Sequence, residues 1–227
     1  MSGNLFVVST PIGNLEDLSF RAVEILSKVD LIVAEDTRIT GNLLKKYEIS
    51  NSMISFNIFN EKSKVDQIVN NINKGKSIAL VSDAGTPCIS DPGYLLVNKI
   101  IKNGLNVFSV PGACSPIAAL SISGLPSDRF IFEGFLPKKK GRKKKIESFK
   151  ESDSTIIFLE SPHRLLKSLK DLELILGNRV VSVCKEITKI NENVFTGKLN
   201  EIISKFEKVN RIRGEYIIII AKKDYEL

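Results

Sequence analysis

The chain has 227 residues, 43% hydrophobic and 26% charged, which is the balance of a soluble globular protein long enough for one large domain or two small ones. Three scattered cysteines, a single histidine and the lack of any long apolar run argue against a disulfide framework, a multi-histidine metal site and a membrane span. The net charge of +7 favours a polyanionic partner, either nucleic acid or an anionic surface.

The first half of the chain alternates short apolar strands with segments that carry apolar residues at helical spacing. The predicted strands cover residues 5–9, 31–34, 53–56, 78–81 and 107–110. Strands alternating with helices at this spacing predict a mainly parallel sheet covered on both faces. The chain enters its first strand without a basic region before an apolar run, so we expect no signal peptide and a cytoplasmic protein.

Residues 78–93 are the most informative stretch, Ile-Ala-Leu-Val-Ser-Asp-Ala-Gly-Thr-Pro-Cys-Ile-Ser-Asp-Pro-Gly. A buried strand ends in a loop of small residues, and Asp91-Pro92 predicts the N-cap and first position of a helix. In open α/β sheets such a loop lies at the carboxyl ends of the strands, where ligands bind, and Asp83 offers an acceptor for hydroxyls or amines. The alternative is a plain strand–helix turn that needs glycine and proline for its geometry, and these residues alone leave both interpretations open.

In the second half of the chain, strands and helices no longer alternate regularly. Strands are predicted at 130–135, 155–159, 180–184, 193–197 and 215–221, with helices after Ser161-Pro162 and over 199–206. This pattern indicates a second α/β domain with more antiparallel pairing. The predicted fold class is therefore α/β with two domains, a mainly parallel sheet in residues 1–112 and a mixed sheet in residues 113–227.

Several familiar chemistries lack their motifs. Residues 75–77 resemble the end of a phosphate-binding P-loop, but no glycine stands at the required upstream spacing. No G-x-G-x-x-G follows the first strand, and no G-x-S-x-G elbow accompanies His163, which argues against a dinucleotide site and a serine hydrolase. Cys114 is interpreted as a small apolar residue in a tight turn, because nothing nearby marks a base that would activate its thiol.

What remains is a set of strand-end loops rich in small residues, aspartate and glutamate. These loops cover residues 10–17, 35–38, 82–91 and 111–115. Because the carboxyl ends of parallel strands share one edge of a sheet, we expect the loops to lie together. Such an edge suits a ligand with an amino acid end, a ribose and a flat base, since amides bind a carboxylate, an aspartate binds ribose hydroxyls and apolar walls hold the base.

Motifs along the chain resemble one family. The chain is similar to the RsmI group of the tetrapyrrole methylase superfamily in its early motifs: Ser-Thr-Pro-Ile-Gly-Asn-Leu-Glu-Asp (9–17), Ala-Glu-Asp-Thr-Arg (34–38), Ser-Asp-Ala-Gly-Thr-Pro (82–87) and Ile-Ser-Asp-Pro-Gly (89–93). Later motifs follow in family order: Pro-Gly-Ala (111–113), Ser-Gly-Leu (123–125), Gly-Phe-Leu-Pro (134–137), Ser-Pro-His-Arg (161–164), Glu-Ile-Thr-Lys (186–189) and Gly-Glu-Tyr (214–216). The resemblance covers essentially the whole chain.

The resemblance implies an enzyme that uses S-adenosylmethionine to methylate the 2′-hydroxyl of a cytidine ribose in the decoding region of 16S ribosomal RNA, in the small ribosomal subunit. It also implies a homodimer and a cofactor cleft between the two α/β domains. With His163 as the single histidine, we expect no metal site. Residues 1–112 would carry the substrate and cofactor loops, and residues 113–227 would complete the cofactor site. By motif position, the implied cofactor-binding residues are Pro11, Ser82, Asp83, Ala84, Thr86, Gly112, Ala113, Leu159 and Ile187.

The implied chemistry is an in-line displacement at a methyl group on a sulfonium, in which positioning supplies much of the rate. A ribose hydroxyl is a weak acid, so a base or an orienting group helps. The candidate catalytic residues at strand ends are Asp36, Arg38, Glu186 and Lys189, with the carboxylates as proton acceptors and the cations as phosphate contacts. The alternative is that Asp36–Arg38 and Glu186–Lys189 are structural ion pairs.

A basic run follows the first strand of the second domain. Its charged residues are Lys138, Lys139, Lys140, Arg142, Lys143, Lys144 and Lys145. Together with the implied RNA substrate, the run indicates a flexible arm that binds phosphates. The alternative is a solvated, mobile loop without a partner.

Two features depart from the family pattern. Relatives often carry histidines in the segment matching residues 57–61, where this sequence has Asn-Ile-Phe-Asn-Glu, and some relatives continue past the final strand. Two other functions stay open: methylation of a small tetrapyrrole or a protein side chain, and a non-catalytic RNA-binding role on the same fold. The basic run and the Ser-Asp-Ala-Gly-Thr-Pro motif favour the ribosomal RNA substrate, since porphyrin branches usually have Gly-Asp-Pro there.

Overall fold

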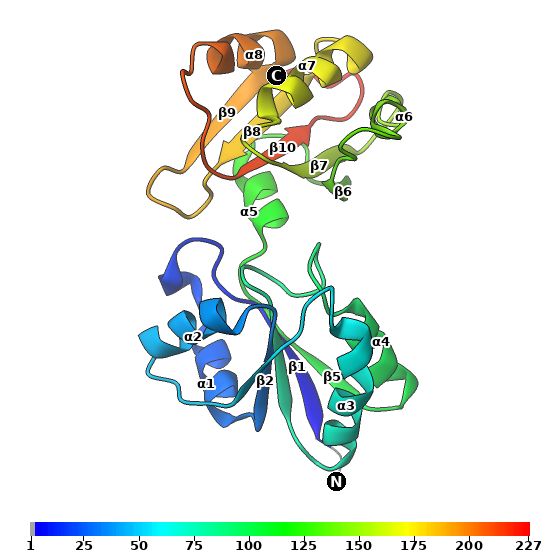
Figure 1. The fold of residues 1–227 in the computed structure, drawn as a ribbon. Helices are drawn as coiled ribbons and strands as arrows, with labels where there is room; N and C mark the ends of the chain where they lie inside the picture. Colours follow the sequence, from blue (N-terminus) through cyan, green and yellow to red (C-terminus); the bar gives the residue numbers. More distant parts are fainter. Residues whose placement is uncertain (1–2) are drawn as a thin grey trace. The chain divides into compact units, whose positions relative to one another are not determined.

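The computed structural model describes residues 3–227, and the chain divides into two compact units, Met1–Cys114 and Ser115–Leu227. Each unit has its own five-stranded sheet and its own hydrophobic core (Figure 1). The division after Cys114 lies close to the predicted one after Gly112. Over residues 3–227, none of the helices has the length and apolar character that crossing a membrane requires.

The first unit contains a parallel sheet, as the alternation of strands and helices predicts. Its strands are β1 (Asn4–Val8), β2 (Leu31–Ala34), β3 (Met53–Ser55), β4 (Ile78–Val81) and β5 (Asn106–Val110), in the order β3-β2-β4-β1-β5. Every neighbouring pair is parallel, so the carboxyl ends of all five strands share one edge. The central strand β4 is buried along its whole length, which its unbroken apolar sequence requires.

Helices cover both faces of this sheet (Figure 1). They are α1 (Phe20–Lys28) and α2 (Thr37–Lys46) on one face and α3 (Glu61–Asn73) and α4 (Tyr94–Lys102) on the other, with a short 3₁₀ turn η1 (Leu15–Asp17) before α1. Successive side chains of a strand point to opposite faces, so Ala79 and Val81 of β4 pack toward α1 and α2. Ile78 and Leu80 of the same strand pack toward α3 and α4.

The second unit contains a mixed sheet, which confirms the predicted increase in antiparallel pairing. Its strands are β6 (Phe130–Phe135), β7 (Thr155–Glu160), β8 (Val180–Lys185), β9 (Asn193–Lys198) and β10 (Tyr216–Ile220), in the order β6-β7-β10-β8-β9. The β6–β7 pair is parallel and the other pairs are antiparallel. One face packs against α6 (Arg142–Glu147), α7 (Leu165–Leu176) and α8 (Leu199–Glu207). On the other face lies α5 (Ser115–Ile122), where the Cys184 thiol lies 3.7 Å from the carbonyl oxygen of Ala119.

The start of α4 differs from the prediction. The helix begins at Tyr94 with Gly93 as its N-cap, so Asp91-Pro92 does not cap it. A side chain from α3 supplies the missing acceptor, because Oε1 of Glu61 accepts hydrogen bonds from the N–H groups of Gly93 (3.1 Å) and Leu95 (3.3 Å). The cap is therefore a tertiary contact, and Asp91 does not have the role that its sequence context predicted.

Candidate functional site

The loops that follow β1, β4 and β5 are hydrogen-bonded into one surface. Thr10 and Gly85 form a bridge in which each N–H donates to the carbonyl oxygen of the other residue, at 2.9 and 3.1 Å. The Thr10 hydroxyl also donates to the carbonyl oxygen of Ser82 (3.1 Å), and the Thr86 hydroxyl donates to that of Ala113 (3.0 Å). The expectation that these loops lie together at one edge of the sheet is therefore confirmed.

Three of the predicted cofactor residues of the first unit take part in these hydrogen bonds: Ser82, Thr86 and Ala113. Asp83 bonds instead to Asp36 in the loop after β2, and Pro11, Ala84 and Gly112 lie in the same loops as the bonded residues. The loops approach so closely at Gly112 that a Cβ there would lie 2.9 Å from the Ser9 Cβ. Glycine is thus required for the close approach. Leu159 lies in β7 and Ile187 just after β8, both in the second unit, and their contribution to a cofactor site stays a prediction.

Carboxylates link the ends of β2 and β4. Oδ1 of Asp83 accepts from the N–H of Asp36 (2.9 Å), and the Asp83 N–H donates to Oε2 of Glu35 (3.3 Å). Burial raises the pKa values of Asp83 and Glu35. Burial and then the charge of Glu35 raise the pKa of Asp91 to about 6. Within residues 3–227, no group of three or more His, Cys, Asp or Glu side chains is placed to hold a metal ion.

The candidate catalytic pair of the first unit is an ion pair that also begins α2. The Arg38 guanidinium lies 2.6 Å from Asp36, and the Asp36 carboxylate caps α2 by accepting from the Arg38 N–H at 2.9 Å. The hydrogen bonds from Arg38 lower the pKa of Asp36 to about 2. A carboxylate with such a low pKa accepts a proton poorly near neutral pH, so the geometry favours a positioning role for Asp36. The Arg38 side chain is 88% exposed and has donors to offer a phosphate.

The candidate pair of the second unit is held by a third residue. Nζ of Lys189 lies 3.2 Å from Oε1 of Glu186 and 3.0 Å from Oε2 of Glu215. The Glu215 N–H donates to Glu186 at 2.9 Å, and this bond is the largest cause of the lowered pKa of Glu186. Like Asp36, Glu186 is held in its ionised form by structural partners.

Backbone strain marks two of the motif loops. Cys88 and Ser90 after β4 have φ angles of 72° and 68°, and Glu186 and Thr188 after β8 have φ angles of 51° and 65°. Residues other than glycine adopt such positive φ values rarely, and they cluster at functional sites. The sequence contains no signal for these angles, because none of these four residues is a glycine.

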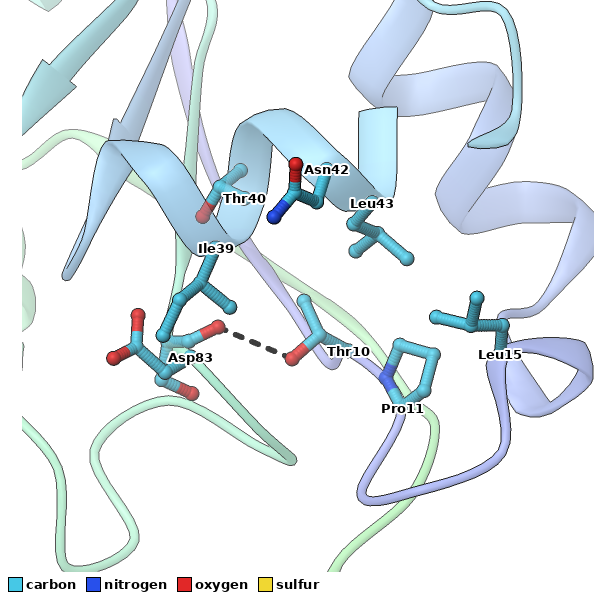
Figure 2. A pocket seen from close by; sticks show the side chains of 9 residues that line it. Thr10, Pro11, Leu15, Ile39, Thr40, Asn42, Leu43 and Asp83 are labelled. Atoms are coloured by element: carbon cyan, nitrogen blue, oxygen red, sulfur yellow. Dashed lines mark hydrogen bonds between the residues drawn. The ribbon is translucent and has the colours of Figure 1, made fainter. Parts of the chain in front are cut away.

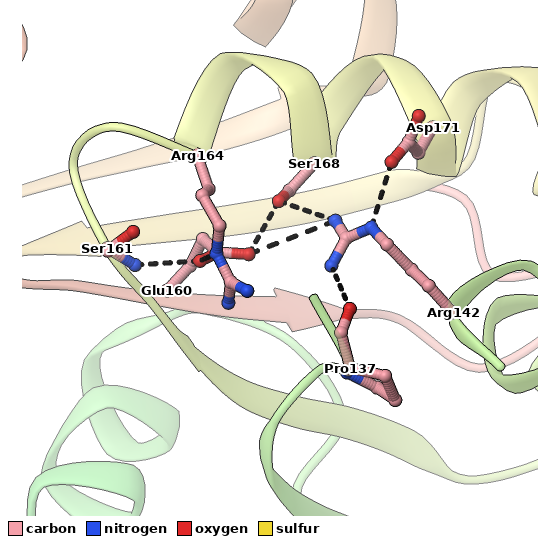
Figure 3. A network of polar contacts seen from close by, with 7 residues as sticks. All are labelled: Pro137, Arg142, Glu160, Ser161, Arg164, Ser168 and Asp171. Atoms are coloured by element: carbon pink, nitrogen blue, oxygen red, sulfur yellow. Dashed lines mark hydrogen bonds and ion pairs between the residues drawn. The ribbon is translucent and has the colours of Figure 1, made fainter. Parts of the chain in front are cut away.

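The basic run is not the flexible arm that its sequence predicts. Residues 142–147 form helix α6, which packs on the core through the buried side chain of Ile146. Arg142 is buried, and its Nε donates to Asp171 at 2.9 Å while Nη2 donates to the Ser168 hydroxyl at 2.7 Å (Figure 3). This placement corrects the interpretation of Arg142 as an RNA contact, because its guanidinium serves the fold.

The lysines of the run differ in exposure. Lys145 pairs with Glu133 at 2.6 Å and lies over the Phe149 ring. The exposed lysines are Lys138, Lys139, Lys140, Lys143 and Lys144. RNA binding by these residues stays a prediction.

A cavity of about 230 Å³ opens beside the loop surface of the first unit (Figure 2). It is lined by Thr10, Pro11, Leu15, Ile39, Thr40, Asn42, Leu43, Ser82 and Asp83. The lining residues that α2 supplies are absent from the predicted site: Ile39, Thr40, Asn42 and Leu43. The helical spacing of residues 39–43 identifies a helix but gives no sign of the cavity that the helix covers.

Comparison with known proteins agrees with these features. The family model described as Tetrapyrrole (Corrin/Porphyrin) Methylases matches residues 4–203. Ribosomal RNA small subunit methyltransferase I of Thermotoga maritima is 46% identical, with 98% of this chain and 100% of that protein covered. The protein of the same name from Escherichia coli O157:H7 is also 46% identical, with 96% of this chain and 77% of that protein covered.

Two solved structures share the fold. Diphthine synthase has a TM-score of 0.78 at 12% identity, with 99% of this chain and 92% of that chain covered. Uroporphyrin-III-C-methyltransferase from Thermus thermophilus has a TM-score of 0.67 at 16% identity, with 97% and 94% covered.

These findings confirm both the predicted α/β fold with two sheets and the family resemblance carried by the motifs. The match extends over almost the whole chain and includes the loops that form the hydrogen-bonded surface. The chain belongs to the tetrapyrrole methylase family and, within it, to the ribosomal RNA small subunit methyltransferase I group.

Proposed function

We propose that this chain transfers the methyl group of S-adenosylmethionine to the 2′-hydroxyl of a cytidine ribose in 16S ribosomal RNA of the small subunit. One observation carries the proposal: the loops after β1, β4 and β5 form a single hydrogen-bonded surface in a chain 46% identical to relatives named for small-subunit ribosomal RNA methylation. Open α/β sheets bind ligands at this edge.

The residues of the first unit fit the cofactor. Within residues 3–227, the N–H groups of Gly112 and Ala113 donate to no other group, and they are available to a carboxylate. Asp83 keeps one carboxylate oxygen beside the loops as an acceptor. When bound, S-adenosylmethionine supplies an electrophilic methyl group on a sulfonium.

The chain's own residues act mainly by positioning. In the reaction an O–C bond forms at the ribose oxygen, the S–C bond breaks with its electron pair left on sulfur, and the hydroxyl proton passes to solvent. Asp36 and Glu186 are held ionised with lowered pKa values, so neither is tuned as a base near neutral pH. The exposed Arg38, anchored by Asp36, is available to hold a phosphate next to the reacting ribose.

The proposal also includes an oligomeric state and a location in the cell. The family resemblance implies a homodimer, which sedimentation of the purified protein would measure directly. We also propose a cytoplasmic location, because a ribosomal RNA substrate would be met there.

The experiment uses purified protein, radiolabelled S-adenosylmethionine and ribosomal subunits from a strain that lacks this methylation. We expect label in the small-subunit RNA and none in large subunits. Asp83→Ala should lower the rate, and Asp128→Ala, which changes an exposed aspartate, should not. Cofactor binding by calorimetry without label in the RNA would contradict the substrate and point to a small molecule or a protein. Absence of cofactor binding would contradict catalysis and favour a non-catalytic RNA-binding role.

A further inference from the structure

We propose that Arg164 binds the phosphate backbone of the RNA substrate, as the oriented member of a cationic edge of the second unit that also includes Lys185 and Arg213. The inference rests on the proposed function and adds to it an RNA contact that lies outside the basic run. Arg164 ends the Ser-Pro-His-Arg motif (161–164), to which the proposed chemistry gives no role.

The Arg164 guanidinium is fixed on one side and open on the other. Its Nε donates to Oε1 of Glu160 at 2.7 Å, and the Glu160 side chain is fully buried at the end of β7. Glu160 also accepts from the Ser161 N–H at 2.8 Å and from the Ser168 hydroxyl at 2.5 Å, so the carboxylate itself is held in place. Within residues 3–227, the two terminal nitrogens of Arg164 donate to no group, and Figure 3 shows them pointing away from α7.

A guanidinium held in this way is suited to an anion from outside the unit. The Arg164 side chain is 24% exposed, so a ligand can reach it. The N–H groups of its two terminal nitrogens form a planar fork that matches two oxygens of a phosphate. Because Glu160 fixes the orientation beforehand, binding costs less side-chain entropy than it would for a freely rotating arginine.

The strand register places a second cation on the same face of the sheet. Glu160 pairs with Tyr216 of β10, and Tyr216 pairs with Lys185 of β8. Directly paired residues point their side chains to the same face, and with strands about 4.8 Å apart the backbones of Glu160 and Lys185 are separated by about 10 Å. Lys185 is half-buried at the end of its strand, and among the described residues its ammonium group forms no hydrogen bond or ion pair.

Arg213 extends the cationic edge. The Tyr216 hydroxyl donates to the carbonyl oxygen of Arg213 at 3.0 Å, which holds the segment before β10 beside this row of residues. The Arg213 side chain is exposed, and over residues 3–227 it has no acidic partner. The neighbouring carboxylates of Glu186 and Glu215 are both bound by Lys189. Cations spread along an edge suit an anion that repeats along a chain, and the RNA backbone is such an anion.

The first test measures the binding of small subunits. We expect Arg164→Gln, Lys185→Gln and Arg213→Gln each to raise the Kd about tenfold, the loss of one charge-assisted contact, and to reduce the slope of log K against log salt by about 0.7–0.9. The KM for small subunits should rise with kcat nearly unchanged, because a phosphate contact is made in both the ground state and the transition state. Lys198→Gln removes the same charge at the opposite end of the β8–β9 pair and is the matched control.

The second test separates the charge of Arg164 from its geometry. Arg164→Lys keeps the charge and loses the fork, so it should keep the wild-type salt slope while the Kd rises. Urea unfolding shows whether the Arg164 variants remain folded. Lys185→Gln and Arg213→Gln change residues outside the buried network of Figure 3, so they test the edge independently of that result.

Three results would count against these claims. Wild-type Kd values and salt slopes in a folded Arg164→Gln, or losses in Lys185→Gln and Arg213→Gln no greater than that in Lys198→Gln, would overturn the proposal. A raised Kd for S-adenosylmethionine that accounts for the whole loss of activity would assign Arg164 to the cofactor and would also overturn it. Failure of the wild-type protein to bind and methylate small subunits would refute the proposed function itself, and that result is distinguishable from the other two.

Discussion

Asp91 lies half-buried in the loop after β4, and its pKa is raised to about 6, first by burial and then by the charge of Glu35. An aspartate in the unfolded chain titrates near 3.8. Between these two values the folded chain retains a proton that the unfolded chain has lost. The contribution of Asp91 to stability therefore decreases as the pH rises from about 4 to about 6 and is constant above that range.

We predict that Asp91→Asn has a larger free energy of unfolding than the wild type at about pH 7.5. At about pH 4.5 the difference should be much smaller, because the Asp91 carboxyl of the folded wild type is ionised only at the higher pH. Urea unfolding at both pH values measures the difference. Asp128→Asn, at an exposed position, should give equal differences at the two pH values. The same gain for Asp91→Asn at both values would contradict the assignment of the raised pKa.

Gly112 sets how closely the β5 loop approaches the β1 loop. A Cβ at Gly112 would lie 2.9 Å from the Ser9 Cβ, and the loop would have to move. We predict that Gly112→Ala raises the Kd for S-adenosylmethionine by about tenfold, because a displaced loop no longer presents its amides as a set. Calorimetry measures the change. Gly41→Ala is the control, since a Cβ there meets only Met53 at an ordinary 3.6 Å; equal Kd values for both variants would exclude a role for the close approach.

At the scale of elements, a buried polar network joins α6, α7 and the end of β7 (Figure 3). Glu160, whose side chain is fully buried, accepts from Arg164 at 2.7 Å and from the Ser168 hydroxyl at 2.5 Å. Arg142 approaches the same carboxylate at 3.9 Å and pairs with Asp171 at 2.9 Å. The network holds α6 on the unit, so the exposed lysines next to Arg142 are presented from a fixed helix.

Removal of Arg142 takes the cation away from Asp171 and leaves the buried Glu160 with Arg164 as its cation. We predict that Arg142→Ala lowers the free energy of unfolding by about 3 kcal/mol, a typical cost of breaking a buried ion pair, whereas the exposed Lys144→Ala changes it by less than about 0.5 kcal/mol. Denaturant unfolding of the two variants measures the contrast. Equal, small effects would mean that Arg142 is not part of the stabilising network.

The sequence predicted those strands and helices whose residue pattern follows directly from burial of their apolar side chains. The apolar runs of β4 and β10 and the alternation of strands and helices identified the sheets, and the small-residue motifs identified the loops at the strand ends. The starts of α4 and α7 were not predictable: α4 is capped by Glu61, which lies far away in the sequence, and α7 begins at Leu165, after the expected Ser161-Pro162. Local signals carry no information about a cap that a different helix supplies.

The role of Arg142 and the position of the cavity were also missed because both depend on contacts between segments far apart in the sequence. Arg142 stands among lysines of equal charge, and only the folded unit brings Asp171 and Ser168 to it. The cavity forms between α2 and the loops after β1 and β4, and no sequence motif indicates that these segments lie next to each other. The sequence therefore identified the loop surface of the candidate site, whereas the cavity wall and the buried network required the structure.

At the scale of the whole molecule, the net charge of +7 and the exposed lysines concern the encounter with RNA. We predict that changing Lys138, Lys139 and Lys140 to Gln weakens binding to small subunits and reduces the slope of log K against log salt by about 0.7–0.9 for each RNA phosphate that the variant no longer neutralises. Filter binding over a series of salt concentrations measures the slope. The cofactor Kd should stay unchanged.

The control for this prediction removes the same charge elsewhere. Lys198, Lys205 and Lys208 are exposed in the second unit, and changing all three to Gln lowers the net charge equally. This triple variant should keep most of the salt slope. Identical slopes for the two triple variants would show that only total charge matters and that the basic run is not a phosphate-binding surface.

The central claim concerns the atom that receives the methyl group. The most direct measurement digests labelled small-subunit RNA with alkali, which requires a free 2′-hydroxyl for cleavage. The account predicts that the label remains in a dinucleotide resistant to alkali whose first nucleoside is cytidine. Label recovered in a single nucleotide would place the methyl group on a base and would contradict the account.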